Sequence, residues 1–167
     1  MKCTECRQVE MVISKESIRY EECGLPNIVL KNVEVKRCPE CGNSLVSIPA
    51  LAGLHKSIAT HLVQQSERLT APEIRFLRKY LGWSKTDFAR KLHVRPEQVS
   101  RWESDSKSMP MNKQSELLLR SLVALGNKIE HYGDQIDSLA LTPPTQPSSM
   151  LSMFYDRYWH NGLMAAA

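Results

Sequence analysis

Residues 84–103 read SKTDFARKLHVRPEQVSRWE, and this stretch decides the fold of the second half of the chain. Its first residue, a serine, stands three positions before Asp87, which is the pattern of a helix N-cap, and Pro96 suits the first turn of a second helix. The spacing predicts helices over Ser84–Leu92 and Pro96–Glu103, joined by a three-residue turn. These are the dimensions of a helix-turn-helix.

The residue types in this stretch support that interpretation. Its apolar residues fall where two crossing helices must bury side chains: Phe88, Ala89, Leu92, Val94, Val99 and Trp102. The exposed face of the second helix presents side chains that hydrogen-bond to base edges in the major groove, predicted here as Arg95, Glu97, Gln98 and Arg101. The cations predicted to contact phosphates are Lys85, Arg90, Lys91 and Lys107.

Charge along the chain points to the same region. Between Thr70 and Lys113 there are ten Lys or Arg and five Asp or Glu, so this segment carries a charge of +5, whereas residues 1–50 balance seven bases against seven acids. Polyanion binding is therefore expected in the middle of the chain. The alternative is a solvated charged face on a helical bundle, which the agreement of charge, turn length and residue types disfavours.

Two Cys-x-x-Cys pairs, Cys3/Cys6 and Cys38/Cys41, predict one structural zinc ion held by four thiolates. A disulfide framework would require an oxidising compartment, but the chain starts without an apolar signal segment, which indicates a cytoplasmic protein with reduced thiols. A redox Cys-x-x-Cys motif normally occurs once and in a βαβ setting, so two such pairs flanking strand-like sequence disfavour a redox role. Cys23 stands alone and is interpreted as a spare thiol.

The sequence around the cysteines predicts a small zinc-stapled antiparallel β domain over residues 1–48, with strands at 9–13 and 28–35. A helical stripe then predicts a spacer helix within 49–69. Capping signals at Thr70 and Asn112 help to define an all-α helix-turn-helix domain over 70–131, which also dimerises. Residues 132–167 are predicted to be a Pro-rich linker and an aromatic tail that docks on this or another protein.

The combination of cysteine knuckles, a spacer and GWSKTDFA (82–89) followed by VSRWE (99–103) and Met109-Pro110 resembles the MqsA family of antitoxins, which has a YgiT-type zinc finger and an Xre-like helix-turn-helix. The resemblance covers about residues 1–131. It implies a zinc-bound N-terminal domain that binds a toxin, and a homodimeric C-terminal domain that represses its own operon by binding a palindromic operator.

This chain departs from the family at three positions. Glu97 stands where these proteins have a base-reading asparagine, so the operator is expected to differ, while Arg101 is retained. Lys85 replaces a glutamine that contacts the DNA backbone, and a lysine can keep that contact as a point charge. Asp105 replaces a glycine in a left-handed position, which aspartate tolerates at some cost.

Three other functions were weighed. A regulator of the same architecture without a toxin differs only in its partner. A zinc enzyme needs an open coordination position, which four thiolates do not leave, and His55 and His61 do not share a helix face, so no enzyme is expected. A protein-interaction adaptor, whose helix-turn-helix only dimerises, would lack salt-sensitive DNA binding.

Overall fold

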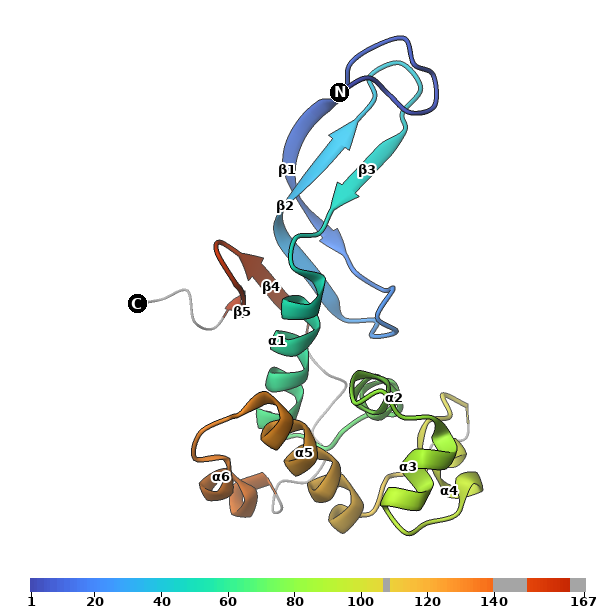
Figure 1. The fold of residues 1–167 in the computed structure, drawn as a ribbon, viewed down its shortest axis with the longest axis vertical. Helices are drawn as coiled ribbons and strands as arrows, with labels where there is room; N and C mark the ends of the chain where they lie inside the picture. The colour runs from blue at the N-terminus through green and yellow to red at the C-terminus, as the bar shows by residue number, and fades with distance from the viewer. Residues whose placement is uncertain (107–108, 140–149, 163–167) are drawn as a thin grey trace.

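The computed structural model describes residues 1–106, 109–139 and 150–162 of the 167-residue chain. The molecule is elongated, with a β-sheet at one end and a group of helices at the other (Figure 1). No helix in the described ranges combines the length and the apolar character needed to cross a membrane. The sheet and the helices are connected by α1 (Leu51–Gln64), which lies beside the sheet and continues toward the helices.

The sheet is mixed, not purely antiparallel as predicted. β1 (Val12–Arg19), β2 (Ile28–Arg37) and β3 (Ser44–Ser47) pair antiparallel around the central β2. β4 (Leu151–Tyr155) pairs with β2 in parallel, and β5 (Trp159–Asn161) pairs antiparallel with β4. The first predicted strand was placed at 9–13, but β1 begins at Val12 because the residues before it belong to the cysteine loop.

The sheet has two parts that meet at an irregularity. The register of β1 shifts between Glu16 and Ile18, and Asn32 on β2 has a left-handed φ of 61°. Before this point β2 pairs with β4 through Ile28–Lys31, and after it β2 pairs with β3 through Glu34–Arg37. We call the part next to the helices the proximal sheet and the part that carries the cysteines the distal ribbon.

The helical half follows the predicted order. It contains α2 (Ala71–Tyr80), α3 (Lys85–Lys91), α4 (Pro96–Trp102), α5 (Lys113–Asn127) and α6 (Tyr132–Leu139). Thr70 and Glu73 form the predicted capping box, and Asn112 Oδ1 accepts from the Ser115 amide at 2.8 Å, as predicted for the N-cap of α5. The predicted end of the helical domain at residue 131 lies before α6, whose Tyr132 hydroxyl donates to the Val63 carbonyl at 2.9 Å.

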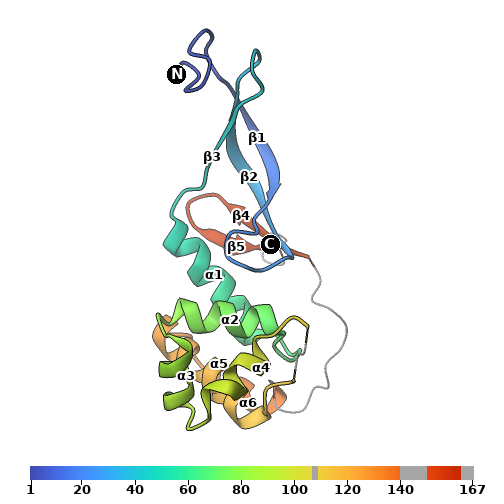
Figure 2. The ribbon, with the colours of Figure 1, turned by 90° about the vertical axis from the view of Figure 1, so that its right-hand side faces the viewer.

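The aromatic tail is the largest difference from the predicted arrangement. It was placed after an all-α domain, but residues 151–161 return to the sheet and form β4 and β5 beside α1 (Figure 2). Met153 and Trp159 are buried, so part of the apolar character of the tail is explained by burial within this chain, while Tyr158 is exposed. The Pro-rich segment, residues 142–149, lies outside the described residues.

One apolar core runs from the proximal sheet through α1 into the helices. It includes Leu30 on β2, Ile58 on α1, Val99 on α4 and Met153 on β4. The distal ribbon has its own small cluster, made of Cys3, Met11 and Cys38. The boundary between these two apolar clusters therefore lies within the sheet and not at α1.

Candidate metal centre and nucleic-acid interface

The four predicted cysteines meet at the end of the distal ribbon. The Sγ atoms of Cys3 and Cys41 are 3.5 Å apart, those of Cys6 and Cys38 are 3.6 Å apart, and all four lie within 4.8 Å of one another. Four sulfurs at about 2.3 Å from a central zinc would be ~3.8 Å apart, so this group matches a tetrahedral thiolate shell. The sulfur positions therefore fit one metal ion.

The backbone explains why the pairs converge. The amide of Arg7 donates to the Cys3 carbonyl at 3.2 Å, and the amide of Gly42 donates to the Cys38 carbonyl at 3.1 Å. Both Arg7 and Gly42 have left-handed φ, 57° and 72°, so the two knuckles turn alike although one has arginine in this position. Each Cys-x-x-Cys segment thereby folds its two sulfurs to one side.

Hydrogen bonds in the cluster perturb two thiol pKa values in opposite directions. A hydrogen bond from the Cys6 backbone is the largest cause that lowers the pKa of Cys3 to about 6. The Asn43 backbone lowers the pKa of Cys41, but hydrogen bonds to neighbouring thiols and desolvation outweigh it and raise this pKa to about 11. Four adjacent thiols do not all ionise readily, because their negative charges repel one another. A bound cation would offset this repulsion.

Cys23 is not a member of the cluster. Its Sγ donates to the Tyr20 carbonyl at 3.7 Å, and burial raises the pKa of this thiol. The prediction that it is not a metal ligand agrees with this position.

The helix-turn-helix is formed by α3, α4 and the turn between them. Ser84 Oγ accepts from the Asp87 amide at 3.0 Å and caps α3, and His93 turns the chain with a left-handed φ of 53°. Of the residues predicted to pack between the helices, Val94 is half-buried and the others are buried: Phe88, Ala89, Leu92, Val99 and Trp102.

The predicted base-reading residues lie together on the exposed side of the second helix. Arg95, Glu97, Gln98 and Arg101 are all exposed. Among the predicted phosphate contacts, Lys85 is exposed, Arg90 forms an ion pair with Asp87 at 2.6 Å, and the Lys91 ammonium lies 4.9 Å from the centre of the Trp83 ring. Lys107 lies outside the described residues.

A buried ion pair, which the sequence did not predict, joins α2 to the C-terminal end of the second helix, α4. Arg78 on α2 donates to both carboxylate oxygens of Glu103 at 2.5 and 2.9 Å, and to the Trp83 carbonyl at 2.7 Å. Arg75 donates to the Glu103 carbonyl and pairs with Asp105 at 3.0 Å. Arg75 and Arg78 contribute to the +5 charge of residues 70–113, and the structure shows that they hold the end of α4 in place.

Comparison with known families identifies the same region. A family model described as Helix-turn-helix matches residues 74–122, which extend from within α2 to within α5. No curated protein and no solved structure was found to be similar to the chain. Residues 74–122 are thus a helix-turn-helix, which supports a role in DNA binding and transcription regulation.

Proposed function

We propose that the chain is a sequence-specific transcriptional regulator with a structural zinc ion, and that it is the antitoxin of a type II toxin-antitoxin pair that represses its own operon. The observation that carries the DNA-binding part is the exposed row Arg95, Glu97, Gln98 and Arg101 on the second helix of a matched helix-turn-helix. Arginine recognises guanine, glutamine recognises adenine, and glutamate accepts from cytosine, so this face offers groups for several bases.

The proposed metal is zinc, held by Cys3, Cys6, Cys38 and Cys41. The close group of four sulfurs supports it, because a Cys₄ set is typical of structural zinc. When bound, the ion would supply folding free energy to a tip with little apolar core. The proposal includes no catalytic activity, since four thiolates would fill the tetrahedral shell.

A homodimer is proposed through α5. Leu118 and Leu125 lie seven residues apart on this helix and are 43 % and 77 % exposed, which is unusual for leucines on one helical stripe. A second copy would cover this stripe and would bring two reading helices to the half-sites of a palindrome.

The toxin would bind the distal ribbon. Four apolar side chains are exposed on its outer strands, namely Val12, Ile13, Leu45 and Val46, and they support a protein partner in this region. The second candidate function is a regulator of the same architecture whose distal ribbon binds no toxin.

The DNA-binding proposal is tested by replacing Arg101 with alanine. We expect the affinity for the sequence upstream of the gene to fall by about 1–3 kcal/mol, because a bidentate base contact is lost. The exposed Arg19 on β1 provides the control, and Arg19→Ala should bind as the wild type does. Equal gel-shift affinities for all three proteins would contradict the assignment.

The antitoxin step needs a separate experiment. The chain is co-expressed with the product of the neighbouring gene, and we expect the two proteins to co-purify and the chain to relieve growth inhibition. A V46D change, which places a charge on the exposed apolar strand β3, should abolish co-purification without affecting DNA binding. If neither co-purification nor neutralisation occurs, the chain is a regulator without a toxin.

A further inference from the structure

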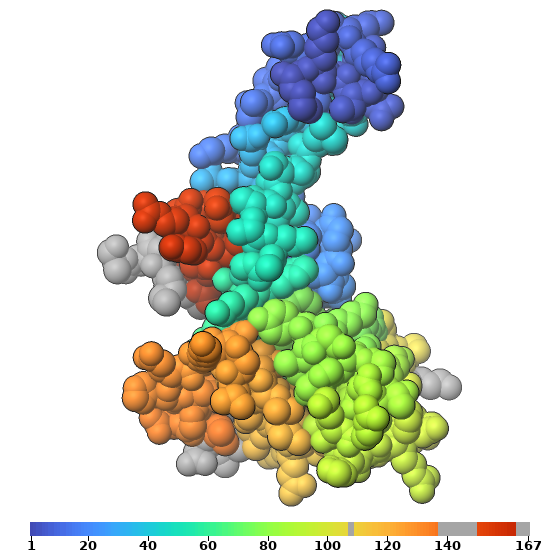
Figure 3. Space-filling view, in the orientation of Figure 1, coloured from blue at the N-terminus to red at the C-terminus, as the bar shows by residue number. Residues whose placement is uncertain are grey.

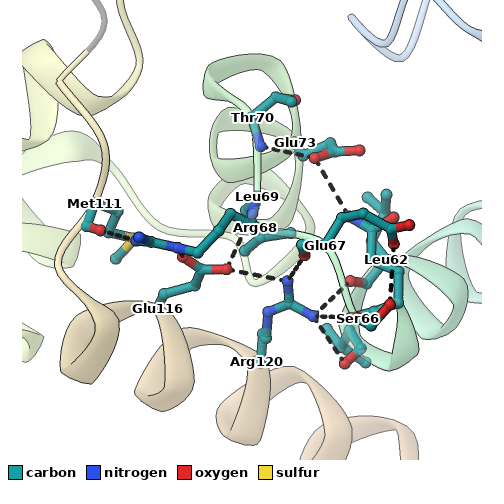
Figure 4. A network of polar contacts seen from close by, with 12 residues as sticks. Leu62, Ser66, Glu67, Arg68, Leu69, Thr70, Glu73, Met111, Glu116 and Arg120 are labelled. Carbon is teal, nitrogen blue, oxygen red and sulfur yellow. Dashed lines mark hydrogen bonds and ion pairs between the residues drawn. The ribbon is translucent and has the colours of Figure 1, made fainter. Parts of the chain in front are cut away.

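The turn between α1 and α2, residues 65–70, is held from one side by an arginine of α5. Arg120 Nη1 donates to the carbonyls of Leu62 and Val63 at 3.3 Å and to that of Gln65 at 2.7 Å (Figure 4). Its Nη2 donates to the Glu67 carbonyl. The carbonyls at the end of a helix have no partner within the helix, so this buried guanidinium caps α1.

Glu116, also on α5, holds the second half of the same turn. Its Oε1 accepts from the Leu69 amide at 2.9 Å and from Arg120 at 3.0 Å, while its Oε2 accepts from Arg68 Nε at 2.7 Å. Arg68 in turn donates to the Met111 carbonyl. Glu116 and Arg120 are buried, and the Glu116 carboxylate pairs with both Arg68 and Arg120.

A second set of contacts joins the sheet to the helices above this turn. Tyr20, directly after β1, shares a hydrogen bond of 2.9 Å with His55 Nε2 on α1. The ring of His55 meets Phe76 of α2 edge to face, with centroids 5.9 Å apart. On α5, Asn127 accepts from the Tyr80 hydroxyl at 2.6 Å and donates to Thr60 at 3.1 Å.

The C-terminal strands fasten α1 to the proximal sheet. Trp159 Nε1 donates to the Pro49 carbonyl at 2.8 Å, and Ser57 Oγ donates to the Trp159 carbonyl at 2.7 Å. Apolar residues of β2, β4 and α1 belong to the same core as those of α2 to α5. Figure 3 shows α1 in contact with the sheet, the tail and the helices on one face.

From these contacts we infer that the proximal sheet, α1 and the helix-turn-helix form one rigid body, locked at residues 65–70. α1 is therefore not a spacer between two freely oriented domains. Bending at the turn would break the hydrogen bonds of Arg120 to the carbonyls of Leu62, Val63, Gln65 and Glu67 and that of the Leu69 amide to Glu116. The two buried charges would then keep only their mutual ion pair, which is disfavoured. The distal ribbon is excluded from this body, because it has a separate cluster and is connected through the irregularity at Asn32.

The inference does not depend on DNA binding, and it is tested without DNA. ¹⁵N relaxation of the full-length protein reports the rotational correlation time of each part separately. We expect the amides of Leu30 and Met153 in the proximal sheet to give the same value as those of Val99 and Val123 in the helices. Different correlation times for these two groups in the wild type would overturn the inference.

The role of the buried network is tested by Arg120→Met, which keeps an unbranched apolar side chain but removes the guanidinium and its hydrogen bonds to α1. The two groups of amides should then separate into two shorter correlation times. Arg37→Met removes an exposed ion pair with Glu16 and is the control, for which a single value is expected. A single value in Arg120→Met as well would show that the buried network is not the lock.

If Arg120→Met does not fold, Glu116→Gln provides the second variant, since it keeps the shape and removes the charge. The correlation times of the two groups of amides should again differ from each other. A single correlation time, as in the wild type, would count against the inference. Fluorescence anisotropy with operator DNA is measured in parallel, so that a failure of the DNA-binding proposal is seen independently of the tumbling result.

Discussion

At the scale of single residues, the buried contact between Arg78 and Glu103 supports the second helix of the helix-turn-helix. Arg78 and Glu103 are buried and doubly hydrogen-bonded, and they fix the C-terminal end of α4 against α2. Arg78→Met is expected to lower the free energy of unfolding by about 3–5 kcal/mol, because it leaves a buried carboxylate unpaired. Urea denaturation followed by circular dichroism measures this change.

The matched control is the exposed pair of Arg90 with Asp87. Arg90→Met should change the free energy of unfolding by no more than about 0–1 kcal/mol, since exposed ion pairs contribute little. Equal destabilisation by the two substitutions would contradict the role assigned to Arg78.

A second prediction at this scale concerns His61 on α1, whose Nδ1 lies 3.1 Å from the side-chain amide nitrogen of Asn161. Burial lowers the pKa of His61, so the unfolded chain, with a histidine pKa of about 6.5, binds the proton more tightly. The free energy of unfolding should therefore decrease as the pH falls from about 7 to 5.5.

His61→Gln should reduce this pH dependence without removing it, because burial also lowers the pKa of His55. Denaturation of both proteins at several pH values tests the effect. The prediction fails if wild type and variant lose stability equally over this range.

The residue identities were sufficient to predict which cysteines cluster but not the buried charges. Cys-x-x-Cys spacing brings the two sulfurs of each pair together through a local turn, and the pairing of β1 with β2 then brings the two pairs to one place. Arg75, Arg78 and Arg120 look like any other cation in the sequence. Arg75 and Arg78 contact Glu103, and Arg120 contacts carbonyls at the end of α1, so these partners lie far along the chain and only the packing of the helices reveals them.

At the scale of elements, local signals predicted the helices well. Ser84, Thr70 and Asn112 each cap the helix that their side chains indicated. The tail was harder, because β4 pairs in parallel with a strand from the other end of the chain. No short-range pattern encodes such a pairing.

The tail therefore carries the third prediction. Met153 on β4 is fully buried between sheet and helix, and Met153→Ala should lower the free energy of unfolding by about 2–5 kcal/mol. Met150, one residue before β4, is 54 % exposed and serves as the control, with little change expected for Met150→Ala. Chemical denaturation of the two variants measures both, and equal values would show that β4 does not pack as described.

At the scale of the whole molecule, the separate distal cluster predicts the effect of metal removal. Chelation should release residues 1–11 and 38–43, because the proposed metal would link these two loops and supply their folding free energy, while the helical half keeps its own core. Hydrogen exchange should increase only in the distal ribbon, and operator binding should persist. Loss of DNA binding at the same chelator concentration would refute this separation.

The division into domains stays a prediction, and the apolar core bears on where its boundary lies. Composition placed a boundary at residues 48–49, where cysteine-rich sequence gives way to a helical stripe. The core instead continues across this position and ends near Asn32, because Leu54 and Ile58 of α1 pack with the proximal sheet. A boundary inside a sheet cannot be predicted from composition, because strand residues lie on both sides of it.

The parallel pairing of β4 with β2 also has a consequence for biosynthesis. The edge formed by Ile28–Lys31 emerges from the ribosome before every helix, yet its partner is made after all of them. At about 5–20 residues per second, this edge waits on the order of ten seconds. During that interval it can pair with another nascent chain, so slower initiation should improve the yield of correctly folded protein.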